Sequence, residues 1–208
     1  MIDICCIGHI TRDKIVTPKA TVNMAGGTSF YFAYGINQLP EKASFRLVTK
    51  VGQDSMDEVE KMRSAGIDVK CYHSEHTVYF ENKYGSNSNN RTQRVLAKAD
   101  PFTIDEMRDL EAKVFHLGSL LDDDFSPEVV KFLSTKGFIS IDVQGYLREV
   151  RGDGVFSVDW RDKEEILECT DILKLNEHEM EVISNLKNPR SVALKLAETG
   201  VREVIITL

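Results

Sequence analysis

The fold is decided by the stretch DILKLNEHEMEVISNLKNPRSVALKLAETGVREVIITL, which runs from Asp171 to Leu208. Its two apolar runs, residues 172–175 and 204–208, have the composition of strands that are buried on both faces. Between them, residues 177–186 and 191–198 carry apolar side chains at helical spacing. Parallel neighbouring strands need a long crossover connection, usually a helix. The stretch therefore predicts a strand–helix–strand unit in a parallel sheet.

The same alternation runs through the rest of the chain. Because strands that alternate with helices build a parallel sheet with helices on both faces, the sequence predicts one α/β domain over residues 1–208. The expected strands are residues 2–7, 46–51, 114–117, 138–143, 172–175 and 204–208. The expected helices are residues 28–39, 55–65, 104–110, 127–134, 163–168, 177–186 and 191–198.

Two stretches interrupt the alternation of strands and helices, residues 14–24 and residues 68–98. Both have the pattern of extended hairpins with polar turns, such as the turn at residues 85–90. One interpretation is a small β-lid at the strand ends of the main sheet, where open α/β sheets bind ligands. The other is two unrelated surface insertions.

The end of the chain predicts an incomplete domain. Residues 204–208 have the pattern of a buried parallel strand, and no helix follows to cover it. A strand at that position leaves apolar surface and an unpaired edge. We therefore expect the fold to be C-terminally incomplete.

The amino-acid composition limits the classes of molecule that the protein is expected to bind. The 208 residues are 42% hydrophobic with a net charge of −7 and an isoelectric point near 5.3, whereas nucleic-acid binding needs a basic surface. A small soluble molecule is the expected partner, with no nucleic acid and no membrane. The chain opens on a strand rather than a leader, and its four cysteines form no C-x-x-C pair, so a cytoplasmic protein with reduced thiols is expected.

Several residues can carry chemistry, and each has a structural alternative. Gly26 and Gly27 precede an expected helix, where backbone amides can approach an anion, but such a pair is also common in plain loops. Asn176 and Glu179 suit a magnesium–phosphate site, but their spacing also suits a helix capping box. Asp13 can bind hydroxyl groups or cap a turn. No dinucleotide or Walker fingerprint is present.

A series of short motifs along the chain resembles the N-terminal motifs of the ribokinase/PfkB family of kinases. In order they are Cys6-Ile7-Gly8 with Asp13, Ala25-Gly26-Gly27, Val51-Gly52-Gln53-Asp54, Ala65-Gly66-Ile67-Asp68, and Leu173-Lys174-Leu175-Asn176-Glu177-His178-Glu179. The resemblance spans essentially the whole chain. It implies a ribokinase-like three-layer α/β/α sandwich with a β-lid, and transfer of the γ-phosphate of ATP to a hydroxyl of a small sugar, polyol or nucleoside.

The resemblance also implies roles for individual residues. Asp13 matches the aspartate that accepts hydrogen bonds from the acceptor hydroxyls, with Gly26 and Gly27 beneath the same acceptor. Asn176 and Glu179 match an N-x-x-E motif that acts through water on Mg²⁺ and the phosphates, so ATP and Mg²⁺ are the expected cofactors, with no direct protein ligand to the metal. The last expected substrate-binding residues are Gly118 and Ser119 at a strand end, and Asp142 and Arg148 in a stretch similar to one in sugar kinases.

The sequence departs from the family pattern at three places. Phe30-Tyr31-Phe32 occupies the position of a common asparagine, and the arginine at 148 is displaced, which makes the chain look closer to inositol and nucleoside kinases. The G-x-G-D segment with the general-base aspartate is expected beyond Leu208, so no catalytic residue is assigned. The alternative is a ligand-binding or regulatory remnant without activity. Alternating apolar residues in 78–84 and 92–97 also predict a homodimer through the lid.

Overall fold

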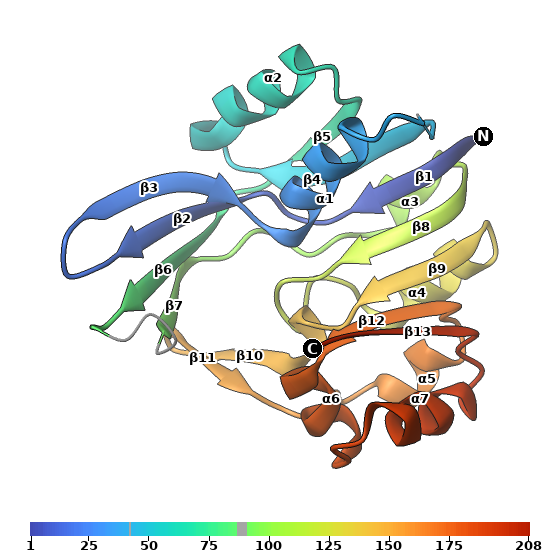
Figure 1. The fold of residues 1–208 in the computed structure, drawn as a ribbon. Coiled ribbons are helices and arrows are strands. Elements are labelled where there is room, and N and C mark those ends of the chain that lie inside the picture. The colour runs from blue at the N-terminus through green and yellow to red at the C-terminus, as the bar shows by residue number, and fades with distance from the viewer. Residues whose placement is uncertain (42, 87–90) are drawn as a thin grey trace.

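The computed structural model describes residues 1–41, 43–86 and 91–208. Its centre is a seven-stranded sheet in the order β13-β12-β9-β8-β1-β4-β5, with every neighbouring pair parallel (Figure 1). Its strands, in chain order, are β1 (Ile2–Ile7), β4 (Phe45–Val51), β5 (Val69–His73), β8 (Ala112–Gly118), β9 (Phe138–Asp142), β12 (Ile172–Asn176) and β13 (Glu203–Thr207).

Helices lie on both faces of this sheet, as expected. On one face α1 (Thr28–Asn37) and α2 (Met56–Ser64) pack against β1 and β4 through a core that includes Ala33, Leu47 and Met62. The other face carries the larger core with α3 (Ile104–Met107), α4 (Pro127–Ser134), α5 (Lys163–Leu167), α6 (Glu177–Ser184) and α7 (Pro189–Ala197). Two single 3-10 turns complete the helical elements, η1 (Gln53–Ser55) and η2 (Gly145–Leu147).

One part of the sheet stays open on the α1 side. Side chains alternate between the faces of a strand, and the registers put Phe138 of β9 and Ile205 of β13 on the same face as Cys6 and His116. Both Phe138 and Ile205 are 49% exposed. The open apolar strip agrees with the expectation of a fold that is incomplete at its C-terminal side.

A second sheet of six strands forms the lid, in the order β10-β11-β7-β6-β2-β3 (Figure 1). The two segments that break the rhythm of the sequence meet here, because β2 pairs in parallel with β6. They are therefore one small β-layer rather than separate insertions. Its strands are β2 (Thr11–Val16), β3 (Thr21–Gly26), β6 (Val78–Tyr84), β7 (Arg91–Ala97), β10 (Arg148–Arg151) and β11 (Gly154–Ser157).

The boundaries of the lid differ from the expectation in three ways. β5, which the sequence pattern groups with the lid, is the edge strand of the main sheet and pairs in parallel with β4. The hairpin β10–β11, which has no clear signal in the sequence, joins the lid at Gly154 beside Arg94. Residues 87–90 of the expected polar turn lie outside the described residues. No helix in the described ranges is long and apolar enough to cross a membrane.

Candidate active site

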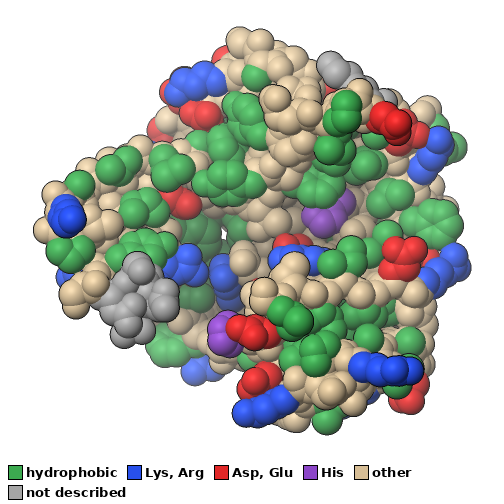
Figure 2. Space-filling view, in the orientation of Figure 1, with side chains coloured by type: hydrophobic (Ala, Val, Ile, Leu, Met, Phe, Trp, Pro, Cys, Tyr) green, Lys and Arg blue, Asp and Glu red, His purple; other side chains and the backbone are tan. Residues whose placement is uncertain are grey.

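Two adjoining cavities lie between the lid and the main sheet. The lid cavity, about 220 Å³, lies beneath β2 and β6 and is lined by Asp13, Gly27 and Asn82 among others. The helix cavity, about 390 Å³, lies at the start of α6 and is lined by Asn176, His178 and Glu179 among others. Figure 2 shows the hollow between the lid and the body, with basic side chains on its wall. Four residues line both cavities: Arg91, Gln93, Gln144 and Arg148.

Asp13 is held in the lid cavity by its own strand and by the neighbouring glycine. Thr11 Oγ1 donates a hydrogen bond to Asp13 Oδ1 at 2.8 Å. A Cβ on Gly26 would lie 2.5 Å from Asp13 Oδ2, so only glycine leaves room for this carboxylate. Partial burial raises the pKa of Asp13, against the opposing effects of Thr11 and the charge of Arg91. The carboxylate therefore has unused acceptor capacity in a half-buried position.

A cluster of glycines lets the start of α1 approach the sheet. Gly27 has a φ of 101°, and a Cβ there would lie 2.7 Å from the carbonyl oxygen of His9. Cβ atoms on Gly8 and Gly118 would lie 2.1 and 2.3 Å from Ser29 Oγ. The backbone at the start of α1 therefore lies directly against the ends of β1 and β8.

Ser119 and Asp142 lie behind the cavity walls rather than in them. Ser119 is fully buried, and its Oγ donates to Asp142 O at 2.9 Å and accepts from Gly145 N at 3.2 Å. The Asp142 carboxylate accepts from Lys174 Nζ at 3.0 Å and from Gln144 N at 3.2 Å. These contacts hold the 144–148 segment in place, so the two residues act on the cavities through Gln144 and Arg148.

Arg148 and Arg91 give the shared wall its charge. Within the described residues neither guanidinium forms an ion pair. Burial, followed by the charge of Arg91, lowers the pKa of Arg148 to about 10, so it remains charged at neutral pH. Two cationic groups without carboxylate partners on one wall favour an anionic ligand, and planar guanidinium groups suit phosphate oxygens.

Asn176 and Glu179 form the capping box of α6 and also line the helix cavity. Asn176 Oδ1 accepts from the amides of His178 and Glu179, both at 2.9 Å, and Glu179 Oε2 accepts from Asn176 N at 2.8 Å. Each side chain thus uses one oxygen in the cap, which leaves Asn176 Nδ2 and Glu179 Oε1 for other partners. Burial raises the pKa of Glu179, and the charge of Asp142 adds to the effect. The structural and the functional interpretations of this motif are therefore compatible.

Asp124 has a role that the sequence does not indicate. The Asp122-Asp123-Asp124 run has the appearance of a solvated acidic loop, but Asp124 is only 3% exposed. Its Oδ2 accepts from the amides of Leu120 and Leu121 at 2.7 and 3.2 Å, and its Oδ1 lies 3.6 Å from Nε2 of the buried His9. Because Leu120 lines the lid cavity, Asp124 shapes the cavity floor from behind.

Several other residues that line the cavities cannot be predicted from the sequence, because no local sequence motif marks them. Asn82, Arg91 and Gln93 come from β6 and β7, whose side chains reach the cavity only once β6 pairs with β2. Tyr31 also lines the lid cavity, at a position where the sequence shows only a departure from a family pattern. Alternation along β6 and β7 marks which side chains share a face, but it does not show which face meets the main sheet.

Comparison with known families places the chain among carbohydrate kinases. A model of the pfkB family carbohydrate kinases matches residues 1–208, and the chain belongs to this family. A comparison with curated protein sequences found no match.

Solved structures of ribokinase-family kinases share the fold. A sulfate complex of a pyrophosphate-dependent kinase in the ribokinase family aligns with a TM-score of 0.90 and 26% identity, over 98% of this chain and 72% of that one. A pyrophosphate-dependent kinase complexed with a pyrophosphate analogue and myo-inositol aligns with a TM-score of 0.89 and 25% identity, over 99% and 72%. Arabidopsis thaliana ribokinase complexed with ribose and ATP aligns with a TM-score of 0.73 and 17% identity, over 99% and 71%.

Proposed function

We propose that the protein is part of a kinase that transfers a phosphoryl group to a hydroxyl of a small sugar, polyol or nucleoside. The acceptor binds in the lid cavity, and the phosphoryl donor binds in the helix cavity. The observation that carries the proposal is the shared wall, where Arg148 and Arg91 border both cavities. Phosphoryl transfer needs donor and acceptor side by side, with cationic groups at the transferring phosphate.

The acceptor side rests on Asp13. A carboxylate can accept hydrogen bonds from two hydroxyl groups and orient the one that reacts. Gly27 lines the same cavity, and Gly26 leaves room for the Asp13 carboxylate. Gly118 and Ser119 support the cavity through Ser29 and Gly145. We take an inositol-like polyol as the first candidate acceptor, because the myo-inositol complex is among the similar structures at 25% identity.

For the donor side we propose ATP with Mg²⁺, and pyrophosphate as a second candidate. The described residues hold no group of three or more His, Cys, Asp or Glu side chains that could bind a metal ion directly. Glu179 fits Mg²⁺ through water, because its Oε1 remains an acceptor outside the cap. Asn176 Nδ2 is a donor and suits a phosphate oxygen. Bound Mg²⁺ would neutralise phosphate oxygens. Pyrophosphate is favoured by Arg91 and Arg148, which form no ion pair with any described residue, and by the donor named for two similar structures.

A second function is a ligand-binding or regulatory protein that keeps the acceptor cavity without phosphoryl transfer. For the 208-residue form it is favoured because no described residue that lines the two cavities is assigned as a general base, the role expected of a G-x-G-D element. A form extended through such an element separates the two: turnover there supports the kinase, and binding without turnover supports the remnant. A cytoplasmic location remains part of our proposal.

The test of the donor site is Arg148→Gln. Calorimetric titration with pyrophosphate and with MgATP should show at least about 10-fold weaker binding, because a charge-assisted contact contributes about 1.5–3 kcal/mol. Arg108→Gln is the matched control, since Arg108 is an exposed arginine that pairs with Asp105 away from both cavities. Equal affinity in wild type and Arg148→Gln would refute the placement of the donor.

A further inference from the structure

The short motif Val51-Gly52-Gln53-Asp54 lines neither the lid cavity nor the helix cavity. Val51 ends β4, and Gln53–Ser55 form the turn η1. A Cβ on Gly52 would lie 3.1 Å from Thr77 N, so the glycine lets the chain just before β6 approach the end of β4. Gly52 N also donates to Thr77 Oγ1 at 2.8 Å. The motif therefore lies where the lid joins the body, which is the main sheet with its helices.

Asp54 contacts both lid segments that meet at this junction. Arg12 Nη1, from β2, donates to Asp54 Oδ2. Thr77 Oγ1, immediately before β6, donates to Asp54 Oδ1 at 3.2 Å. Burial would raise the pKa of Asp54, but the hydrogen bond from Thr77 and the charge of Arg12 lower it below its usual value. The carboxylate is therefore ionised at neutral pH, and it links β2 and β6 to the same point of the body.

The two strands carry the residues of the lid cavity on their other face. In the β2–β6 register, Arg12 lies opposite Tyr79 and Asp13 lies opposite Phe80. Arg12 also lies over the Tyr79 ring, 4.9 Å from its centroid. Successive side chains of a strand point to opposite faces, and Asp13 and Phe80 line the lid cavity. A contact that holds Arg12 on the outer face therefore also holds Asp13 on the inner face.

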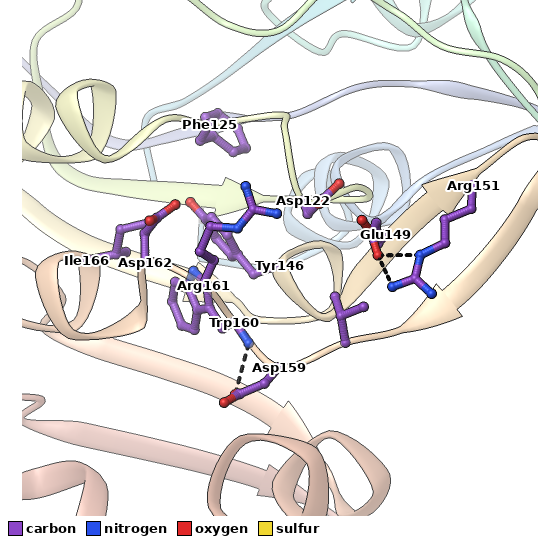
Figure 3. Close-up of a pocket in the computed structure, with 11 residues that line it drawn as sticks. Asp122, Phe125, Tyr146, Glu149, Arg151, Asp159, Trp160, Arg161, Asp162 and Ile166 are labelled. Atoms are coloured by element: carbon purple, nitrogen blue, oxygen red, sulfur yellow. Dashed lines mark hydrogen bonds and ion pairs between the residues drawn. The ribbon is translucent and has the colours of Figure 1, made fainter.

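The pair between Arg12 and Asp54 is the one ion pair, among the described residues, that joins a lid strand to the body. The other ion pairs of the lid strands stay within the lid: Lys14–Glu81, Glu81–Arg94, Arg94–Asp153 and Glu149–Arg151. Figure 3 shows the last of these on β10, beside a cavity of about 290 Å³ that shares no lining residue with the lid cavity or the helix cavity. Glu149–Arg151 is thus a partly exposed pair of the lid that does not reach the body.

We propose that Asp54 is a positioning residue for the acceptor site. Its carboxylate fixes the adjoining ends of β2 and β6 to the body and so keeps Asp13 in its place in the lid cavity. The body supplies the facing wall of that cavity, with Thr28 of α1 and Gln144 before η2, so the width of the cavity depends on how the lid is held. The effect on the acceptor rests on the proposed function, whereas the hold on the lid does not.

Amide hydrogen exchange, measured by NMR, tests the hold on the lid. Asp54→Asn keeps the size of the side chain and removes its charge. The amides of β2 and β6 should exchange about 3- to 10-fold faster in this variant, which is the scale of one exposed ion pair with its hydrogen bond. Arg12→Gln should have the same effect, and the double variant should exchange no faster than either single variant. Glu149→Gln, which breaks the pair within β10, should leave these exchange rates unchanged.

Titration of the same variants with myo-inositol tests the consequence for the acceptor. Asp54→Asn and Arg12→Gln should weaken myo-inositol binding by at least about 3-fold, because Asp13 is then less well preorganised, and Glu149→Gln should not. Unchanged exchange in β2 and β6 of Asp54→Asn would overturn the proposal, and so would faster exchange with undiminished myo-inositol affinity. Failure of the wild type to bind myo-inositol would instead count against the proposed function, and the exchange rates would still decide whether Asp54 holds the lid.

Discussion

At the scale of single residues, Asp13 carries the acceptor proposal. Its carboxylate is half-buried and lines the lid cavity, and among the described residues it accepts a side-chain hydrogen bond from Thr11 alone. Replacing it by Asn keeps the shape and the Thr11 contact but removes the charge. We expect Asp13→Asn to weaken binding of an inositol-like polyol by about 10- to 100-fold, from the loss of hydrogen bonds to a charged group. Calorimetry measures this, with Asp105→Asn on the exposed side of α3 as the control.

The same substitution should leave stability intact. Burial raises the folded-state pKa of Asp13, so in wild type the free energy of unfolding falls as pH rises from the unfolded pKa through the folded one. Asn cannot titrate, so Asp13→Asn should lose this dependence and melt at or slightly above the wild-type temperature at neutral pH. Polyol affinity in wild type should rise over the same pH range. A large drop in melting temperature would show that Asp13 is structural and that the acceptor is misplaced.

At the scale of elements, two glycines of the α1 region should respond oppositely to alanine. Gly27 precedes α1 with a positive φ and no room for a Cβ, whereas a Cβ on Gly35, within α1, would meet no other atom within 4 Å. Gly27→Ala should lower the free energy of unfolding by about 1–3 kcal/mol, because of backbone strain and the contact with His9 O. Gly35→Ala should raise it by about 0.5–1 kcal/mol. Urea unfolding measures both, and equal effects would contradict the packing described at the start of α1.

A comparison of the N-cap residues of α6 and α7 distinguishes a capping role from a ligand-binding role. Asn176 caps α6 beside the helix cavity, and Asn188 caps α7 by accepting from Ser191 N at 3.0 Å. Each Asn→Ala change should cost about 1 kcal/mol of stability. Only Asn176→Ala should also weaken MgATP or pyrophosphate binding in a titration. If the two variants bind these donors equally well, the motif at 176–179 is a cap alone.

The elements that the sequence predicts well are those with strong local periodicity. The pattern at residues 127–134 matches α4 at both ends. Each apolar run overlaps a strand of the main sheet, and the runs at 138–143 and 204–208 extend one residue past β9 and β13. The pattern places the ends of α1 and α3 too late, because apolar residues continue past the last helical turn. It also groups β5 with the lid, since an edge strand next to a hairpin has the same alternation as the hairpin itself.

The site is predictable only in part, for a similar reason. Asp13, Gly27, Arg148, Asn176 and Glu179 sit on local motifs and do line the cavities. Long-range pairing decides the rest. Arg91 and Asn82 reach the cavity through the β2–β6 pairing, and the burial of Asp124 depends on His9, more than a hundred residues away in sequence.

At the scale of the whole molecule, we propose that the lid is a homodimer contact. Val22 and Met24 of β3 are 52% and 47% exposed, and the β2–β3 and β2–β6 registers put them on the face that carries Asp13 and Phe80. An exposed apolar face at the end of a projecting sheet is stabilised when a partner molecule covers it. Sedimentation at high micromolar concentration should show a dimer. Met24→Lys should shift it to monomer, whereas Leu194→Lys on the exposed side of α7 should not, and a strict wild-type monomer would contradict the proposal.

The most direct measurement of the central claim is phosphoryl transfer by the 208-residue form itself, followed by phosphorus NMR with myo-inositol and either MgATP or pyrophosphate. We assign an acceptor cavity and a donor cavity to these residues but no general base, whose contribution is typically about 100- to 10,000-fold. We therefore predict binding of acceptor and donor with little or no turnover. Robust turnover by the 208-residue form that Glu179→Gln abolishes would contradict this, because a base would then lie within these residues, at the start of α6.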